Sequence, residues 1–331
     1  MPLDLALSPY HLATREAPAM LALMLGDRVV TLMPRPTRGQ SREGVRETIE
    51  AAPRYLRLME SWRWSAPLWR SGVISSAYQG EDASCELEGV YAEIDSSAAL
   101  TSLRPLVRSA AKRAAESPDQ SLDLIAADVL KGGPDPGINI PITAAIDRFA
   151  VRHDCCVVRG GVASIAQRAE SRLGRRAFAV ALPILLRAGG GRLERLRTDL
   201  SPALADLRSA ILRCVQASLS PDADAAMLQA ACRVQDAAVA FAAAFSAWAP
   251  LGATGDDENS ERVVAGYVSV AGMVMPADAA LRSSRAALRA MHGFGTGIGP
   301  ADDDTPDEPI TGADRPLFAL VVREMTLTPE R

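Results

Sequence analysis

Apolar and polar positions near the start of the chain predict a strand–helix–strand unit. Residues 3–7 and 29–33 are short apolar runs, and a longer apolar stretch between them ends at Gly26. Apolar runs of about five residues are typical of buried strands, and glycine commonly ends a helix. Residues 3–33 therefore predict a β-α-β unit with two parallel strands, joined by a helix that begins near Thr14.

Further apolar runs predict strands in the rest of the chain, at residues 155–161, 177–186, 262–276 and 317–327. The run at 177–186 contains Pro183, which predicts either an edge strand or a buried, kinked helix. Residues 193–248 follow a helical period instead. The balance predicts an α/β or helix-rich α+β fold, with a mainly parallel sheet, many helices and a C-terminal strand that returns to the sheet.

The length of 331 residues allows two domains or one large one. A division near residue 133 gives an N-terminal α/β half, residues 1–133, and a helix-rich C-terminal half, residues 134–331. Return of the last strand to the main sheet would instead make the chain one domain. Residues 293–316 are rich in glycine, proline and acidic residues, and predict a flexible acidic linker.

Composition and charge narrow the function classes. Hydrophobic residues make up 48% of the chain and the net charge is −4, so nothing predicts a general attraction to nucleic acid or anionic lipid. The sequence shows neither a signal peptide nor an apolar stretch of the roughly 20 residues that span a membrane. We therefore expect a soluble cytoplasmic protein, and the excess of Arg over only two Lys is typical of GC-rich bacterial genomes.

The five cysteines and three histidines do not show the spacing of a metal site. The sequence contains no CxxC pair, and zinc requires about four well-placed ligands. We expect no metal, and the sequence indicates no particular cofactor. Cys155 and Cys156 are predicted to be buried strand residues rather than nucleophiles.

Polar side chains follow the first two predicted strands. Tyr10 and His11 come after the first strand, and Arg35 and Arg38 after the second. Ligands bind at the carboxyl ends of parallel strands, and histidine titrates near neutral pH. Tyr10 and His11 are therefore candidates for proton transfer and the two arginines for anion contacts, although ordinary surface loops would give the same pattern.

The segment from residue 155 to 164 has the outline of a phosphate-binding loop, with a strand, a Gly-Gly pair and a helix start. Arg159 is its candidate anion contact. The segment matches neither GxGxxG nor GxxxxGK[ST], and a tight turn into a capped helix explains it equally.

The stretch KGGPDPGINIPI, residues 131–142, predicts a connector between two helices, because Gly-Gly ends a helix and Asp-Pro-Gly is turn chemistry. Asp135 and Asn139 are candidates for binding a polar ligand. Residues 62–69 hold three of the four tryptophans, which predicts buried packing rather than a nucleic-acid surface.

No pattern specific to a family or to a catalytic class is present, so two function hypotheses stand. The first is binding of a protein partner or a small ligand. The second is an enzyme that acts on an anionic or phosphorylated small molecule, through the loops after the first strands. The sequence does not indicate the oligomeric state.

Overall fold

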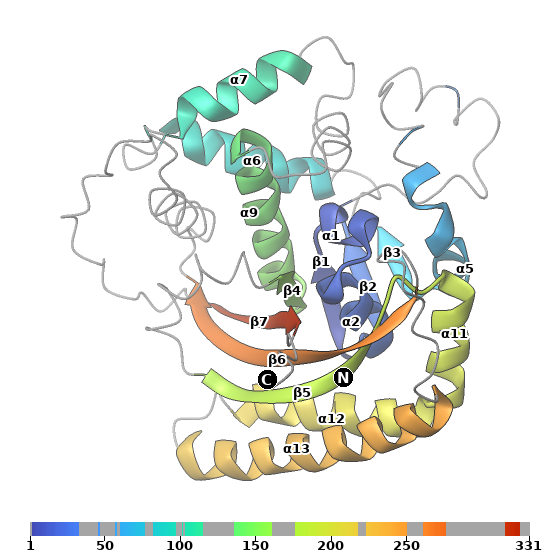
Figure 1. Cartoon of the computed structure of the whole chain (residues 1–331). Helices are drawn as coiled ribbons and strands as arrows, with labels where there is room; N and C mark the ends of the chain where they lie inside the picture. The colour runs from blue at the N-terminus through green and yellow to red at the C-terminus, as the bar shows by residue number, and fades with distance from the viewer. Residues whose placement is uncertain are drawn as a thin grey trace, which may run out of the picture.

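The chain is built around one sheet in this computed structural model (Figure 1). The structure describes residues 2–32, 60–76, 82–96, 103–114, 136–160, 176–217, 223–249, 261–275 and 315–324, together with residues 46, 57 and 101. The strands are β1 (Asp4–Leu7), β2 (Arg28–Thr31), β3 (Ile74–Ser76), β4 (Cys156–Gly160), β5 (Arg176–Leu186), β6 (Arg262–Met275) and β7 (Arg315–Glu324). The helices are α1 (Pro9–Thr14), α2 (Ala17–Leu25), η1 (Arg63–Ser65), α5 (Ala66–Arg70), α6 (Asp82–Ser96), α7 (Arg104–Ala114), α9 (Pro136–Arg152), α11 (Gly190–Asp199), α12 (Ser201–Ala217) and α13 (Ala223–Trp248).

The sheet has the strand order β3-β2-β1-β4-β7-β6-β5 among the described residues. The first five strands in this order are parallel, and β6 runs antiparallel to both of its neighbours, β7 and β5. The predicted α/β class, the mainly parallel sheet, the opening β-α-β unit and the return of the C-terminal strand are therefore confirmed. β7 lies inside the sheet, between β4 and β6.

The connection between β1 and β2 contains two helices rather than the single one expected. α1 begins directly after β1, and its first residue is a proline, whose fixed backbone angle favours the start of a helix. The helix expected to begin near Thr14 and to end at Gly26 is α2, which begins at Ala17, whereas Thr14 ends α1. Tyr10 and His11 consequently lie in α1 and not in a loop.

Helices cover both faces of the sheet. On one face α9 packs against β1, β4 and β7, and α6 and α7 pack against α9 (Figure 1). On the other face α2 packs against β4, β5 and β7, and α13 packs against β5 and α12. β4 shows both faces at once, since Arg159 pairs with Asp147 of α9 while Gly160 faces α1 and α2.

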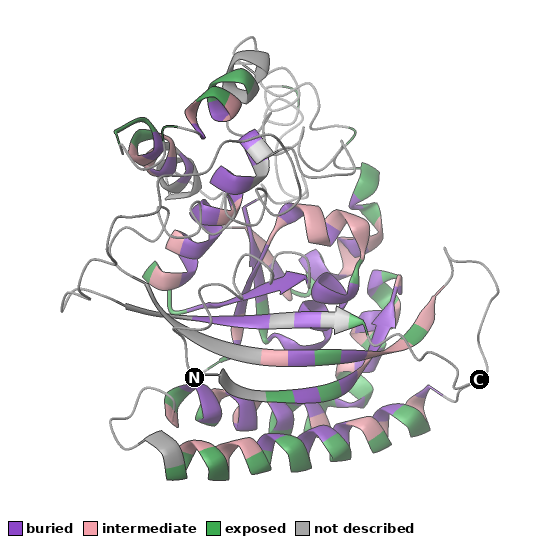
Figure 2. Cartoon of the chain, turned by 60° about the vertical axis from the view of Figure 1, so that its left-hand side comes forward, coloured by how far each residue is buried: buried purple, intermediate pink, exposed green. Residues whose placement is uncertain are grey.

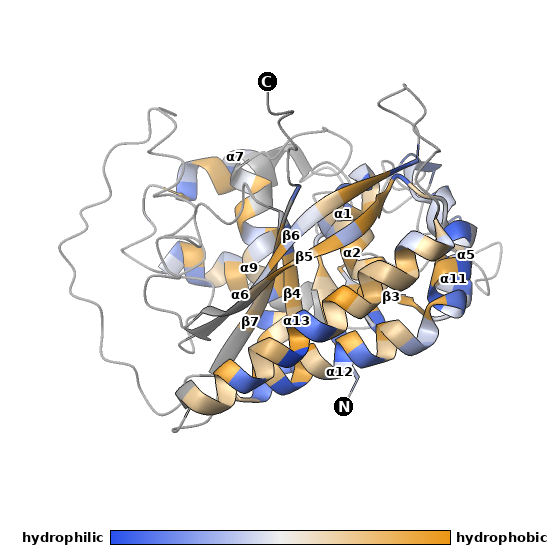
Figure 3. Ribbon diagram, turned by 60° about the horizontal axis from the view of Figure 1, so that its bottom comes forward, coloured by the Kyte–Doolittle hydropathy of each residue, from blue (hydrophilic) through white to orange (hydrophobic). Residues whose placement is uncertain are grey.

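Burial follows this layering. The strands at the centre are buried almost throughout, whereas α12 and α13 are buried on one side and exposed on the other (Figure 2). Hydrophilic and hydrophobic residues alternate along both helices, as expected for amphipathic helices that cover a sheet (Figure 3). The helical period predicted for residues 193–248 is thus confirmed in the described part of this range, which holds α11, α12 and α13.

Residues 177–186 belong to an edge strand, β5, and the alternative of a kinked helix is wrong. Pro183 pairs with Ala265 of β6. β5 is the last strand in the described sheet, and an edge strand tolerates a residue without a backbone N–H.

The connector predicted at residues 131–142 is wrong from Pro136 onward, because α9 begins there. Proline is favourable in the first turn of a helix, so the Asp-Pro-Gly sequence that resembles a turn instead marks a helix start. Ile138, Ile142 and Ala145 are buried on α9, at helical spacing.

One sheet takes β1–β3 from residues 1–133 and β4–β7 from residues 134–331. The division of the chain at this point stays a prediction. In the predicted acidic linker at 293–316, residues 315 and 316 belong to β7, and residues 293–314 lie outside the described part of the chain.

Gly190 begins α11 in close contact with η1 and α5. A Cβ at this position would lie 2.6 Å from the carbonyl oxygen of Trp64 and 2.9 Å from Cδ of Pro67. We expect Gly190→Ala to lower the free energy of unfolding by about 1–3 kcal/mol, because overpacking forces the backbone to shift. Urea denaturation measures this change.

Gly191→Ala is the matched control for Gly190→Ala. Among the described residues, no atom outside the adjoining turn of the helix lies within 4 Å of a Cβ at position 191. Alanine favours a helix over glycine by roughly 0.5–1 kcal/mol, so this variant should be neutral or slightly more stable than the wild type. Equal losses in both variants would contradict the packing argument.

Candidate functional site at the carboxyl edge of the sheet

The strand order places a topological switch point between β1 and β4. The chain moves from β1 to β2 and β3 on one side, and then returns to β4 on the other side of β1. In open α/β sheets, ligands bind outside the carboxyl ends of the strands at such a point. A ligand site is therefore expected among the residues that follow β1 and those that end β4.

His11 lies at this switch point, against the end of β4. A Cβ at position 160 would lie 3.3 Å from Cε1 and 3.8 Å from Nε2 of His11, and 3.3 Å from Cγ of Pro18. These distances are tight, so glycine at position 160 leaves room for the imidazole ring. Position 160 and the start of α1 together fix the ring over the carboxyl end of β4.

Glu16 forms a hydrogen bond with the imidazole ring of His11. Nδ1 of His11 lies 3.3 Å from Oε2 of Glu16, and the two side chains are 16% and 46% exposed. This hydrogen bond lowers the pKa of Glu16, although partial burial opposes the shift. A carboxylate only accepts hydrogen bonds, so Nδ1 carries the proton and donates it, and in the neutral form of the ring Nε2 bears the lone pair.

The bend after α1 brings Glu16 to His11. Arg15 has a left-handed backbone with φ of 54°, which ends α1 and turns the chain into α2. Tyr10 contacts the same histidine edge to face, with ring centroids 5.7 Å apart. The structure therefore brings Tyr10, His11 and Glu16 together at the start of the first crossover.

The ends of the neighbouring strands add polar groups to this edge. Thr31, the last residue of β2, pairs with Leu7 of β1 on one side and with Ser76 of β3 on the other. Thr31 is 2% exposed, and its Oγ1 has no hydrogen-bond partner among the described residues. A buried hydroxyl of this kind is an unused donor and acceptor at the edge where ligands bind.

Arg159 does not join His11. Its guanidinium forms a buried ion pair with Asp147 of α9, on the face of the sheet opposite to His11. Arg35, Arg38 and Asp135 lie outside the described residues. Asn139 lies in α9, and its side chain is outside the described part of the chain.

Sequence reasoning missed Glu16 and Thr31 as members of this edge. Glu16 follows His11 by five residues, which is not the spacing of one helical face. Only the left-handed turn at Arg15 makes the two side chains neighbours. Thr31 lies within an apolar run, where a strand residue is the ordinary interpretation.

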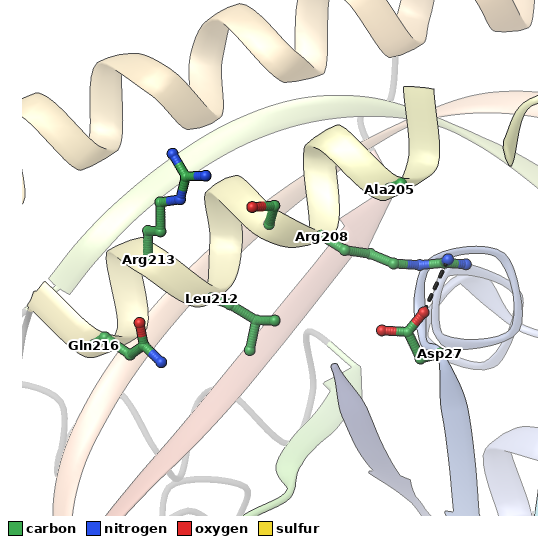
Figure 4. A pocket seen from close by; sticks show the side chains of 7 residues that line it. Asp27, Ala205, Arg208, Leu212, Arg213 and Gln216 are labelled. Atoms are coloured by element: carbon green, nitrogen blue, oxygen red, sulfur yellow. Dashed lines mark ion pairs between the residues drawn. The ribbon is translucent and has the colours of Figure 1, made fainter. Parts of the chain in front are cut away.

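The opposite, amino edge of the sheet carries a pocket of about 310 Å³ between α12 and Asp27 (Figure 4). Asp27 pairs with Arg208 at 3.0 Å and accepts a hydrogen bond from the backbone of Leu3 at 2.8 Å. Arg213 extends from α12 away from Asp27 (Figure 4). Since Arg208 and Asp27 are engaged with one another, we interpret their part of this pocket as structural.

The arginines at that edge bind the carboxyl end of α2, as Arg197 shows. Its Nη1 donates to the carbonyl oxygens of Leu23 at 2.8 Å and Gly26 at 2.7 Å, at the end of α2. Cations stabilise the negative carboxyl end of a helix. Burial lowers the pKa of Arg197 to about 10, so the guanidinium stays charged at neutral pH and caps α2.

Among the described residues, no three His, Cys, Asp or Glu residues gather as they would around a metal ion. Burial raises the pKa of Cys155 to about 11 and that of Cys156 to about 12, so both are protonated at neutral pH. The predicted burial of these two cysteines is confirmed, and protonated thiols are poor nucleophiles.

None of the described helices combines the length and the apolar character needed to cross a membrane. Comparisons of the chain with protein-family models, with curated proteins and with solved structures find no match.

Proposed function

We propose that this chain is an enzyme that binds a polar small molecule at the carboxyl edge of its parallel sheet, and that His11 accepts a proton from it there. The observation that supports this most is the His11–Glu16 pair, held against Gly160 at the switch point. Of the two functions expected from the sequence, this pair favours the enzyme, because binding alone does not require an imidazole with a fixed tautomer.

Each residue has a defined part in this proposal. Nε2 of His11 takes the proton, and the ring becomes an imidazolium. Glu16 is a positioning residue, which fixes the proton on Nδ1 and stabilises the positive ring that forms. Gly160 supplies the space for the ring.

We also propose that this is a bacterial, cytoplasmic protein. The described cysteines, Cys155, Cys156, Cys214 and Cys232, form no disulfide, which suits a reducing compartment. The excess of Arg over Lys supports the bacterial origin.

His11→Gln should lower kcat/KM by about 100-fold or more, because a positioned proton acceptor contributes roughly 10²–10⁴-fold to a rate. The substrate is first found with a panel of hydroxylated and carbonyl metabolites in D2O, in which NMR detects turnover and deuterium incorporation. His153→Gln is the matched control, since His153 is exposed, lies against Phe149 and precedes β4 at the amino edge of the sheet, opposite to the edge that holds His11. A panel without turnover, or a His11→Gln variant at the wild-type rate, would refute the proposal.

Glu16→Gln tests whether Glu16 fixes the tautomer of the His11 ring in addition to stabilising the fold. The ¹⁵N shifts of the His11 ring should show the Nδ1–H tautomer in the wild type and a mixture in the variant.

The lowered pKa of Glu16 means that its pair with His11 stabilises the fold above the carboxyl pKa of the unfolded chain. That contribution is lost as pH falls through the lowered pKa of the folded chain, so the stability gap between wild type and Glu16→Gln should narrow on acidification.

A further inference from the structure

α13 presents an apolar outer face that no described residue covers. Figure 2 shows this helix at the outside of the molecule, and its inner side packs against β5 and α12. Leu228 and Val239 are 69% and 59% exposed, and they are the most exposed of the large hydrophobic residues in the described part of the chain. Large exposed apolar side chains on one helix indicate an interaction surface.

This outer face carries little charge. Only Arg233 and Asp236 are charged among the exposed residues of α13 whose side chains are described. A soluble surface ordinarily holds about 25–35% charged residues, so the outer face of α13 differs from a face that meets only water. Its two charges are opposite in sign, and two copies of the face would therefore not repel each other.

The outer face is self-complementary about the middle of the helix. α13 spans residues 223–248, so its midpoint lies between Gln235 and Asp236. In an antiparallel pair of α13 helices centred at this point, each residue lies opposite the one that is equally far beyond the midpoint. Leu228 then lies opposite Ala243, and Cys232 lies opposite Val239, and all four are exposed. Each large side chain thus meets a smaller one, as close packing requires.

Arg233 and Asp236 add charge complementarity to this arrangement. The two residues lie on either side of the midpoint, and in the described part of the chain neither forms an ion pair. Antiparallel pairing brings Arg233 of each copy to within about 3 Å, measured along the helix axis, of Asp236 of the other copy. A parallel pair would instead place each charge beside its like, so the charges favour the antiparallel arrangement.

We propose that α13 is the interface of a weak homodimer, in which the α13 helices of two copies of this chain pair antiparallel about a two-fold axis between Gln235 and Asp236. A helix of 26 residues is about 39 Å long and about 10–12 Å in diameter, so the pair would bury roughly 400 Å² on each copy. A stable interface of standard size buries about 800 Å² on each partner, so we expect a dissociation constant in the micromolar range or weaker.

Sedimentation equilibrium of the full-length chain over a wide range of concentrations tests the dimer. We expect reversible association of the wild type, and association at least 10-fold weaker in Val239→Glu, which brings a carboxylate into the apolar contact. Tyr267→Glu is the matched control, since Tyr267 is a large hydrophobic residue that is 44% exposed on β6. This control should associate as the wild type does. Circular dichroism and Tm establish that each variant is folded.

A charge swap tests the antiparallel arrangement. Arg233→Asp should weaken association, because an aspartate at position 233 would lie beside Asp236 of the second copy, and Asp236→Arg should weaken it through two arginines. The double variant Arg233→Asp with Asp236→Arg should recover the wild-type association, because each copy again offers opposite charges to the other. Both positions are exposed, so none of these variants is expected to unfold the chain.

A disulfide tests the register of the two helices. Val239→Cys should form interchain disulfides with Cys232 of the second copy in oxidised glutathione, because facing positions of two closely packed helices come within reach of a disulfide. The wild type should not, since its two Cys232 residues would lie about 10 Å apart along the helix axis. A gel run without reductant separates the two results.

A chain that stays monomeric at every concentration would overturn the dimer, as would a dimer that keeps the wild-type affinity in Val239→Glu. Equal losses in Val239→Glu and Tyr267→Glu would do the same, and so would a double charge variant that does not recover. A monomer that binds vesicles of neutral phospholipid, and loses this binding in Val239→Glu, would assign the outer face to a membrane surface and reject the dimer.

Discussion

Arg159→Met should lower the free energy of unfolding by about 3–5 kcal/mol, because it removes the cation that pairs with a buried carboxylate. The side chain of Asp147 is 1% exposed and that of Arg159 is 11% exposed, and the two form an ion pair between α9 and β4. Removal of the Arg159 cation leaves the negative charge of Asp147 buried between α9 and β4. Urea denaturation, with unchanged m-value as the check on two-state behaviour, measures the loss.

The double variant Asp147→Leu with Arg159→Met should recover much of that stability, since an apolar pair of similar size often replaces a buried ion pair at little cost. Arg108→Met is the control for loss of a cation in general. The Arg108–Asp95 pair, at 3.2 Å, has side chains that are 70% and 58% exposed, and such pairs contribute about 0–1 kcal/mol. Similar losses in Arg159→Met and Arg108→Met would contradict the role of burial.

The same pair shows why a strand can be predicted correctly although the side of the sheet on which one of its side chains lies is not. The sequence predicts a strand at residues 155–161, close to the observed β4, and it offers Arg159 as an anion contact near the end of that strand. Side chains alternate along a strand, so Arg159 and Gly160 face opposite sides of the sheet. Which side holds the crossover from β1 depends on the strand order, and a single sequence does not show the strand order.

Elements that depend on local sequence patterns are predicted more reliably than the packing between them. The β-α-β unit rests on apolar runs within residues 3–33, and the edge strand observed at β5 is one of the two alternatives that Pro183 leaves open for residues 177–186. Local turn chemistry was less reliable, because Pro136 suits both a turn and the first turn of a helix. The packing of α9 decided between them, and that packing is not visible in the residues around Pro136.

The candidate site could be predicted only in part, because its parts come from separated segments. His11 was expected at the carboxyl end of the first strand, and that is its place. Glu16 reaches it only through the left-handed turn at Arg15.

Deletion of β7, by ending the chain at residue 314, should abolish cooperative folding. β7 pairs with β4 on one side and with β6 on the other, so its loss divides the sheet into two parts. Both newly exposed edges would present unpaired backbone groups, which promote aggregation. Deletion of an edge strand would expose only one such edge, so the interior position of β7 makes the expected effect larger.

Two further chains separate loss of β7 from loss of the terminus as such. A chain that ends at Glu324 keeps the whole of β7 and should unfold with the wild-type Tm. Leu320→Asp keeps the backbone but places a carboxylate at a position that is 0% exposed, and it should be destabilised by several kcal/mol, as is typical of a buried unpaired charge. Solubility, near-UV circular dichroism and thermal unfolding measure all three. A soluble chain ending at residue 314 with a wild-type Tm would contradict this prediction, because it would show that β4 and β6 do not depend on β7 for their stability.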